Sequence, residues 1–243
     1  MLKILAFDIW GSYAHYKKIF ATTSALSYAI PSKTAIYGYI GAVIGLDKFD
    51  NQYLNSFQPD SCKIGLQVRR DIVMQRISTN LHPHTKGLIR KNQNRKPTTI
   101  EYVYAPKYRV YFWHKDTVIY EALKKHLVNH TAVYTPCLGL ANLLSNFEFI
   151  DEYEVQGNKD ISSSISVSSV IPRSYFKGFD FDAFGIENEI IEYSQYAVEM
   201  NTEREVTQRD DVFFDRKGQA IQAFVKQSYQ LQNDNTKQHI ILF

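Results

Sequence analysis

The spacing of apolar and polar residues predicts a first strand followed by a helix. Residues 2–10 are mostly apolar, which is typical of a buried strand, and Gly11 ends the run. Ser32 precedes a stripe of apolar residues at helical spacing, so we expect a helix over 33–44 with Ser32 as its N-cap. The stripe consists of Ile36, Ile40, Val43 and Ile44.

The chain then continues with further strands and a second helix. Apolar and polar residues alternate over 61–79, with an interruption near Ile72 that we interpret as a bulge. We expect an aromatic strand over 100–114, an amphipathic helix over 117–130 and a last strand over 147–156. The order β-α-β-β-α-β is typical of the ferredoxin-like α+β fold, in which two helices cover a four-stranded antiparallel sheet. RNA-recognition domains share this plan.

Two segments lie outside this plan. Residues 82–99 have few apolar residues and no periodicity, which indicates a long basic loop or a protruding hairpin between the middle strands. After residue 156 the sequence becomes acidic, and its strand-like pieces become shorter. We therefore predict one domain over 1–156 and a smaller β-rich region over 157–243.

Glycines form a second stripe on the first predicted helix, at Gly38, Gly41 and Gly45. A glycine inside a helix costs about 1 kcal/mol relative to alanine. We therefore expect a sheet or another backbone to approach this face closely, and Gly45 to end the helix as a C-cap. Because the stripe lies inside a helix rather than before one, it does not form a phosphate-binding loop.

The net charge of +3 is distributed unevenly along the chain. Residues 63–115 carry twelve basic and two acidic side chains, whereas residues 116–243 carry eleven basic and nineteen acidic ones. Residues 1–62 are nearly neutral. A basic middle block is typical of a site for a polyanion such as RNA, and a solvated loop with a chance excess of charge is the alternative.

Aromatic residues are interleaved with these cations. Tyr102 and Tyr104 precede Lys107 and Arg109, for example. Cations beside exposed rings can hold phosphates and stack unpaired bases, which is how single-stranded RNA is commonly bound. Neighbours in a strand point to opposite faces, so part of this set can face one ligand. The candidate RNA-binding residues of the basic block are Arg69, Arg76, Lys86, Arg90, Lys91, Arg95, Lys96, Lys107 and Arg109.

Other chemistries lack the residues that they need. The two cysteines, Cys62 and Cys137, do not form a C-x-x-C pair, and His126 and His130 have no evident third ligand. We therefore predict no disulfide framework, no metal site and no cofactor. The sequence shows no signal-peptide pattern and no run of about 18 apolar residues, so we expect a cytoplasmic protein that does not contact a membrane.

A small cluster near the N-terminus leaves an enzymatic alternative open. Metal-independent RNA cleavage needs a general acid and base, together with a cation that stabilises the developing phosphorane. Tyr13, His15 and Lys18 lie close enough in sequence to supply these groups. The same residue types also hold RNA without cutting it, and we predict binding rather than catalysis.

The stretch from Phe7 to Asp47 resembles the N-terminal signature of the Cas five family of CRISPR-associated RAMP proteins. The similar features are Trp10-Gly11, the patch from Tyr13 to Lys18, the run from Thr22 to Thr34, the glycine-containing segment from Gly38 to Gly45, and the later turn from Tyr134 to Gly139. The type I-B form of the family is the most similar.

This resemblance implies an RNA-recognition-like RAMP domain with an inserted basic thumb, at about 82–99, and a variable C-terminal β region. It implies a non-catalytic subunit of a type I Cascade ribonucleoprotein complex that caps the 5′ handle of the guide RNA (crRNA) in antiviral defence. The implied partners are the handle, the backbone subunit and the large subunit, with target DNA reached indirectly through the complex. Carried over by position, the RNA contacts of the N-terminal part are Tyr13, His15, Lys17, Lys18, Ser27, Tyr28, Ser32 and Lys33.

Two alternatives remain at this point. In type I-C, members of the family cut repeat RNA themselves, so a metal-independent endoribonuclease that uses Tyr13, His15 and Lys18 is the second hypothesis. A single-strand RNA-binding module unrelated to CRISPR is the third. The first two differ in whether these three residues meet at a scissile phosphate, and the third differs from both in lacking specificity for the handle.

Overall fold

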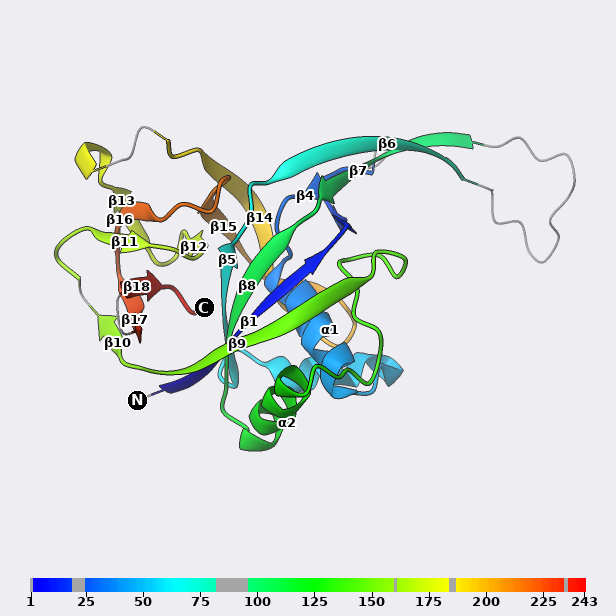
Figure 1. The fold of residues 1–243 in the computed structure, drawn as a ribbon, viewed down its shortest axis with the longest axis horizontal. Helices are drawn as coiled ribbons and strands as arrows, with labels where there is room; N and C mark the ends of the chain where they lie inside the picture. Colours follow the sequence, from blue (N-terminus) through cyan, green and yellow to red (C-terminus); the bar gives the residue numbers. More distant parts are fainter. Residues whose placement is uncertain (1, 19–24, 82–95, 160, 184–186, 234–235) are drawn as a thin grey trace, which may run out of the picture.

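The computed structural model describes residues 2–18, 25–81, 96–159, 161–183, 187–233 and 236–243. Its central sheet has four antiparallel strands in the order β5-β8-β1-β9 (Figure 1). The strands are β1 (Leu2–Gly11), β5 (Cys62–Val68), β8 (Lys107–His114) and β9 (Ser145–Val155), and the helices are α1 (Lys33–Ile44) and α2 (Thr117–Val128). This strand order and connectivity confirm the predicted ferredoxin-like α+β fold.

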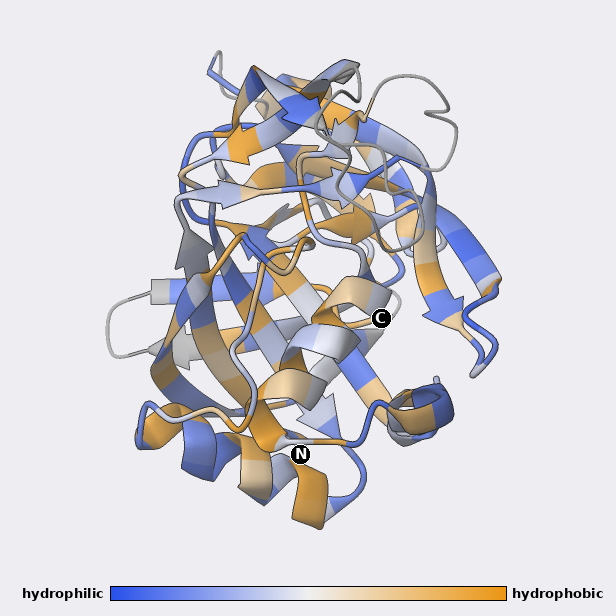
Figure 2. Cartoon of the chain, turned by 90° about the vertical axis from the view of Figure 1, so that its right-hand side faces the viewer, coloured by the Kyte–Doolittle hydropathy of each residue, from blue (hydrophilic) through white to orange (hydrophobic). Residues whose placement is uncertain are grey.

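Helix α1 begins and ends where local sequence signals place its caps. The Ser32 Oγ accepts a hydrogen bond from the Ala35 N–H at 3.1 Å, and Gly45 adopts a left-handed conformation with φ of 79°. Ile36, Ile40 and Val43 are buried in the main core, as their spacing predicts. In Figure 2, α2 at the foot of the molecule carries both hydrophilic and hydrophobic segments, in agreement with its amphipathic pattern.

A two-stranded ribbon projects from the body of the molecule (Figure 1). It consists of β6 (Val73–Leu81) and β7 (Lys96–Tyr104), which pair antiparallel from Val73 opposite Tyr104 to Leu81 opposite Lys96. The predicted single strand over 61–79 is therefore wrong, because β5 and β6 belong to different sheets. Ile72 lies between them and is buried, and its N–H donates to the Arg216 carbonyl, so the interruption in alternation marks a change of sheet rather than a bulge.

The predicted strand over 100–114 is divided in the same way. Ala105 has a positive φ of 44° and separates β7 from β8, which lies in the central sheet. The chain therefore leaves the body along β6 and returns along β7. The predicted thumb over about 82–99 falls at the outer end of this ribbon, and most of it lies outside the described residues.

Short strands beside the ribbon position the N-terminal candidate residues. β2 (Tyr13–Ala14) pairs with β7, and β3 (Tyr16–Lys17) pairs with β4 (Ser27–Tyr28). A 3-10 segment, η1 (Phe49–Phe57), follows α1. The chain from residue 12 to residue 18 thus runs from the base of the ribbon towards the core.

The chain after residue 156 is rich in β-structure, as predicted. One sheet has the order β10-β17-β18-β11-β16-β13 and another has the order β12-β15-β14. These strands are β10 (Gly157–Lys159), β11 (Ile165–Val167), β12 (Ile171–Pro172), β13 (Phe176–Phe179), β14 (Ile190–Met200), β15 (Val206–Asp215), β16 (Ile221–Val225), β17 (Gln227–Asn233) and β18 (Thr236–Ile240), with a 3-10 turn, η2 (Phe181–Ala183). Tyr196 and Val198 of β14 belong to the same core cluster as the buried face of α1. The division at residue 156 stays a prediction.

Candidate nucleic-acid interface

Three tyrosine rings gather at the base of the ribbon. The Tyr13 ring lies 5.7 Å from the Tyr102 ring and 5.6 Å from the Tyr104 ring, between centroids. The Tyr13 hydroxyl donates to Gln75 Oε1 at 3.2 Å, which fixes the ring against β6. Tyr104 is 48% exposed. Rings held in this way offer flat faces on which unpaired bases can stack.

Exposed cations lie on the ribbon and near its base. The Arg76 side chain on β6 is 69% exposed, and its Nε lies 3.3 Å from Glu101 Oε2, so it lies on the ribbon face opposite to Tyr102 and Tyr104. Arg70 donates to the Ala105 carbonyl at 3.1 Å, and Arg69 and Lys17 are exposed. A concavity of about 470 Å³ adjoins the cluster and is lined by Trp10, Gly11, Ser12, Arg70, Tyr104, Ala105, Leu144, Ser145 and Asn146. Sequence reasoning missed Trp10 and Leu144 as members of this surface, because Leu144 comes from a distant turn.

Lys18 occupies a second aromatic site. Its Nζ lies 5.6 Å from the centre of the Tyr28 ring and 5.2 Å from that of Tyr193, at distances typical of cation–π contacts. Burial raises the pKa of both phenols, so the two rings remain neutral beneath the ammonium group. Sequence reasoning identified Lys18 and Tyr28 but not Tyr193, which lies on β14 and has no signal near the first two in sequence.

The three residues of the enzymatic alternative are divided between two environments. His15 is 5% exposed, its Nδ1 lies 2.7 Å from the Glu101 carbonyl oxygen, and its ring lies 5.8 Å from that of Tyr102. Tyr13 contacts the same Tyr102 ring, whereas Lys18 stands over Tyr28 and Tyr193. The structure thus brings Tyr13 and His15 to one ring and Lys18 to others.

Three residues predicted to contact RNA have hydrogen-bond partners inside the fold. The Ser27 Oγ is buried, accepts from the Tyr16 N–H at 2.8 Å and donates to the Tyr28 carbonyl at 2.7 Å. Lys33 is 2% exposed, and its Nζ lies 2.6 Å from Glu199 Oε1. Ser32 caps α1 but is half-buried, so its contact with RNA stays a prediction. We exclude the side chains of Ser27 and Lys33 from the candidate interface, because both are buried with internal partners.

Arg109 and Lys107 neutralise a buried carboxylate. Asp8 is 2% exposed, and Arg109 grips it with Nε at 2.7 Å from Oδ1 and Nη2 at 3.2 Å from Oδ2. Burial alone would lower the pKa of Arg109, but the bond to Asp8 raises the pKa above its ordinary value and keeps the guanidinium charged. Lys107 Nζ lies 3.2 Å from Asp8 Oδ2 and 5.4 Å from the centre of a Trp10 ring. The Arg109 side chain, which is 15% exposed, is therefore engaged by Asp8 rather than available to RNA. The Lys107 side chain is 31% exposed and can still contact a ligand.

The remaining predicted residues belong to the end of the ribbon. Lys96 begins β7 and pairs with Leu81. Lys86, Arg90, Lys91 and Arg95 lie outside the described residues. Among the residues that are described, no three His, Cys, Asp or Glu side chains come together to hold a metal ion, and no helix has the length and apolarity to span a membrane.

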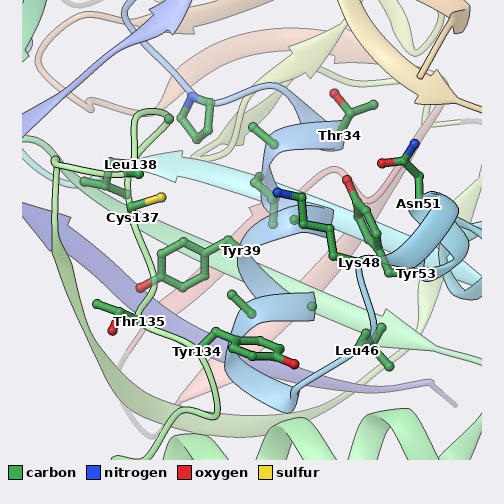
Figure 3. Close-up of a pocket in the computed structure, with 18 of the residues that line it drawn as sticks. Thr34, Tyr39, Leu46, Lys48, Asn51, Tyr53, Tyr134, Thr135, Cys137 and Leu138 are labelled. Carbon is green, nitrogen blue, oxygen red and sulfur yellow. The ribbon is translucent and has the colours of Figure 1, made fainter. Parts of the chain in front are cut away.

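A groove of about 690 Å³ lies beside α1, and Tyr16 is among the residues that line it. Figure 3 shows Tyr39, Tyr134 and Cys137 on one side of α1, and Asn51 and Tyr53 on the other. Sequence reasoning did not predict this groove. The signal that could have found it is the glycine stripe, because no atom of the described residues lies within 4 Å of a Cβ added at Gly38. The expected close approach of another backbone to Gly38 is therefore wrong.

Known proteins resemble this chain along most of its length. A CRISPR protein from Archaeoglobus fulgidus is 10% identical, with a TM-score of 0.51 and coverage of 98% of both chains. A solved Cas protein is 12% identical, with a TM-score of 0.48 and coverage of 92% of this chain and 94% of the other. A chain of a CRISPR RNA-guided surveillance complex is 10% identical, with a TM-score of 0.43 and coverage of 92% and 90%. No curated protein matches the chain at a significant level.

The family is established by the sequence rather than by these distant structures. The profile of the family described as "CRISPR-associated protein (Cas_Cas5)" matches residues 4–209. This match includes the central sheet, both helices, the ribbon, β14 and the first four residues of β15. The Archaeoglobus structure supports the same fold. The chain therefore belongs to the Cas five family of CRISPR-associated proteins.

Proposed function

We propose that this chain is a non-catalytic subunit of a type I CRISPR effector complex, in which it caps the 5′ handle of the guide RNA. One observation carries the proposal: the rings of Tyr13, Tyr102 and Tyr104 meet at the base of the projecting ribbon, where Arg70 lines the same concavity as Tyr104. Membership of the Cas five family supports a role in CRISPR defence. The handle is single-stranded and therefore has unpaired bases that can stack on such rings.

The charges at this site suit a phosphate backbone. Lys17 and Arg69 are exposed, and Arg76 has one carboxylate partner at 3.3 Å but remains 69% exposed. Glu101 is 12% exposed and also accepts from the Ser27 N–H, so it keeps a partner when the exposed Arg76 exchanges it for a phosphate. Lys18 Nζ lies over the rings of Tyr28 and Tyr193. Each phosphate contact releases condensed counterions, so binding should weaken as salt rises.

The proposal assigns the protein contacts to the ribbon. Within the described residues, β6 is an edge strand of the sheet β2-β7-β6, and its side chains at Val73 and Met74 are 45% and 38% exposed. An exposed edge strand with apolar side chains is suited to contact with another chain. We place the backbone subunit along this ribbon and the large subunit against the body of the molecule, with target DNA reached through them.

The surroundings of His15 support a binding role without catalysis. A general base must reach the proton that it removes, and His15 is 5% exposed with Nδ1 against the Glu101 carbonyl. Lys18, the cation of the enzymatic alternative, stands over other rings. We therefore assign Tyr13 and Lys18 to holding RNA, and His15 to supporting the cluster from beneath.

The test is a titration of the chain with two fluorescein-labelled RNAs, one carrying the 5′ handle of the associated repeat and one with the handle bases scrambled. We expect tighter binding of the handle RNA and, for both RNAs, a salt dependence that reflects phosphate contacts. Equal affinity for both RNAs would indicate a general single-strand RNA-binding module. Absence of binding, by the chain alone and with the backbone subunit present, would overturn the proposal.

A further inference from the structure

The floor of the groove beside α1 is formed by helix positions that have small side chains or none. Thr34, Ala35, Gly38, Gly41 and Ala42 of α1 all line the groove. A Cβ added at Gly38 would meet no atom within 4 Å. A glycine inside a helix is unfavourable by about a factor of five in equilibrium terms relative to alanine. Packing within the chain does not explain Gly38, since nothing in the described residues approaches it.

A buried hydroxyl group at this groove lacks a partner. Tyr16 lines the groove and is 8% exposed, and its OH has no hydrogen-bond partner among the described residues. Burial, followed by the neighbouring Tyr108 and Tyr39, raises the pKa of this phenol, so it remains a neutral donor. A buried polar group without a partner is rare in native structures, and one explanation is a ligand that supplies the partner.

The walls and rim have the chemistry of a site for a base attached to a phosphate. Tyr53 and Tyr134 line the groove from opposite sides of α1 (Figure 3). Lys48 and Arg204 also line it, with Asp47 as the acidic member of the lining. Rings can flank a flat base, and the two cations can neutralise the phosphate that accompanies it. The volume of about 690 Å³ is large enough for a nucleotide.

The groove and the interface proposed above adjoin one short segment of the chain. The backbone N–H of His15 donates to the Leu138 carbonyl at 3.0 Å, and Leu138 lines the groove. The segment from Tyr13 to Lys18 therefore separates the ring cluster of Tyr13 from the groove at Tyr16. The RNA strand of the proposal lies across this segment and contacts both.

We propose that the groove beside α1 binds an unpaired base of the RNA strand held at the ribbon base, with the base lying over Gly38 and accepting a hydrogen bond from the Tyr16 hydroxyl. This inference rests on the proposed RNA-binding function. It adds a pocket that receives one base, so the chain reads one position of its RNA as well as gripping the backbone. A peptide of a partner subunit is the other conceivable occupant, and the cations of the rim favour RNA over it.

The experiment is a double-mutant cycle that combines a substitution in the groove with the removal of single bases from the RNA. The groove is filled in the variant Gly38→Leu, and the matched control is Gly178→Leu, because Gly178 also has open space around an added Cβ and lies on β13, away from the groove. Each protein is titrated with handle RNA and with handle RNAs that lack one base at a time. The coupling between two changes shows whether they act at the same contact.

We expect Gly38→Leu to weaken binding of handle RNA about tenfold and Gly178→Leu to leave it unchanged. Removal of one particular base should weaken binding to the unchanged protein by the same factor and have no further effect on Gly38→Leu. If Gly38→Leu fails to fold, Tyr16→Phe replaces it. That variant should keep its melting temperature and lose about fivefold in affinity, whereas a merely structural hydroxyl would leave RNA affinity unchanged.

The outcomes separate the two proposals. If the unchanged protein binds handle RNA but no base couples to the groove, the inference is wrong and the proposed function stands. If Gly38→Leu binds RNA normally but no longer co-purifies with the backbone subunit, the groove holds a peptide and the inference is again wrong. Loss of RNA binding by the unchanged protein would instead reject the proposed function itself.

Discussion

Two antiparallel strand pairs of this protein differ in what surrounds them. In the pair β1–β8, side chains such as Leu5, Phe7 and Val110 are fully buried. In the ribbon β6–β7, every described side chain of β6 from residue 73 to residue 80 is at least partly exposed. Hydrogen-bonded ladders alone do not distinguish the two pairs. The difference is that β1 and β8 bury most of their side chains, whereas β6 leaves its side chains exposed and β7 buries Tyr102 and Val103 at the base of the ribbon.

The charged residues follow the same division. In the body, Lys33 meets Glu199 and Arg109 meets Asp8, and all four side chains are largely buried. At the base of the ribbon, Arg76 is 69% exposed, and Lys17 is exposed as well. A basic residue in the middle of this sequence is therefore not by itself a nucleic-acid contact. Its burial decides whether its charge is available.

The largest expected effect comes from breaking an ion pair of the body. Lys33→Ala leaves Glu199 buried without its partner, so we expect the free energy of unfolding to fall by about 3–5 kcal/mol. Urea denaturation measures this change. The matched variant on the ribbon is Arg76→Ala, which removes an exposed cation from Glu101. It should cost less than about 1 kcal/mol, because the Ser27 N–H still donates to that carboxylate. Equal losses in the two variants would remove the distinction between body and ribbon.

The next effect concerns the rings at the base of the ribbon. Tyr13→Ala removes a stacking surface, so we expect RNA binding to weaken by about 1–3 kcal/mol while the fold remains stable. Tyr13→Phe retains the ring and should bind nearly as well as the unchanged chain. Fluorescence anisotropy with handle RNA measures both affinities. The placement of RNA at this cluster is wrong if the two variants lose affinity equally.

A smaller effect is expected from the lysines beside the cluster. Replacing Lys17 and Lys18 by alanine should weaken RNA binding and reduce the slope of log affinity against log salt by about 0.7 for each lost phosphate contact. The control is the pair Lys115→Ala and Lys125→Ala, two exposed lysines at the start of α2 and within it. An unchanged slope in the Lys17 and Lys18 variant would contradict their assignment as phosphate contacts.

The smallest effect on stability is expected from shortening the ribbon. Deletion of residues 84–94 keeps the paired strands up to Leu81 and Lys96, so the free energy of unfolding should change by less than about 1 kcal/mol. Assembly with the backbone subunit should nevertheless be impaired, which co-purification measures. Failure of the shortened chain to fold would show that the segment belongs to the core.

Local signals allowed some of this structure to be predicted, and long-range contacts explain what was missed. Ser32 and Gly45 were identified as caps because capping depends on residues a few positions away. The roles of Lys33 and Arg109 could not be inferred, since their partners lie 166 and 101 residues away in sequence. The division between β5 and β6 was missed because alternation continues on both sides of Ile72, and alternation does not reveal which sheet a strand joins.

The same reasoning applies to the candidate site. The patch from Tyr13 to Lys18 was identified from the sequence because its residue types are adjacent, and the structure places Tyr13 and Lys18 at aromatic surfaces. Tyr193, Tyr53 and Tyr134 were missed because each comes from a distant segment. A glycine stripe predicts that another group approaches the helix closely, but it does not identify that group. Within the described residues, no atom approaches Gly38.

The most direct test of the central claim uses the purified chain, end-labelled repeat RNA and EDTA. The account predicts that the chain retains RNA carrying the handle and leaves it intact, with binding reduced in Tyr13→Ala. Site-specific cutting that is lost in His15→Ala would contradict the account, because it would show that the cluster at the base of the ribbon processes the repeat rather than holding a guide made by another protein.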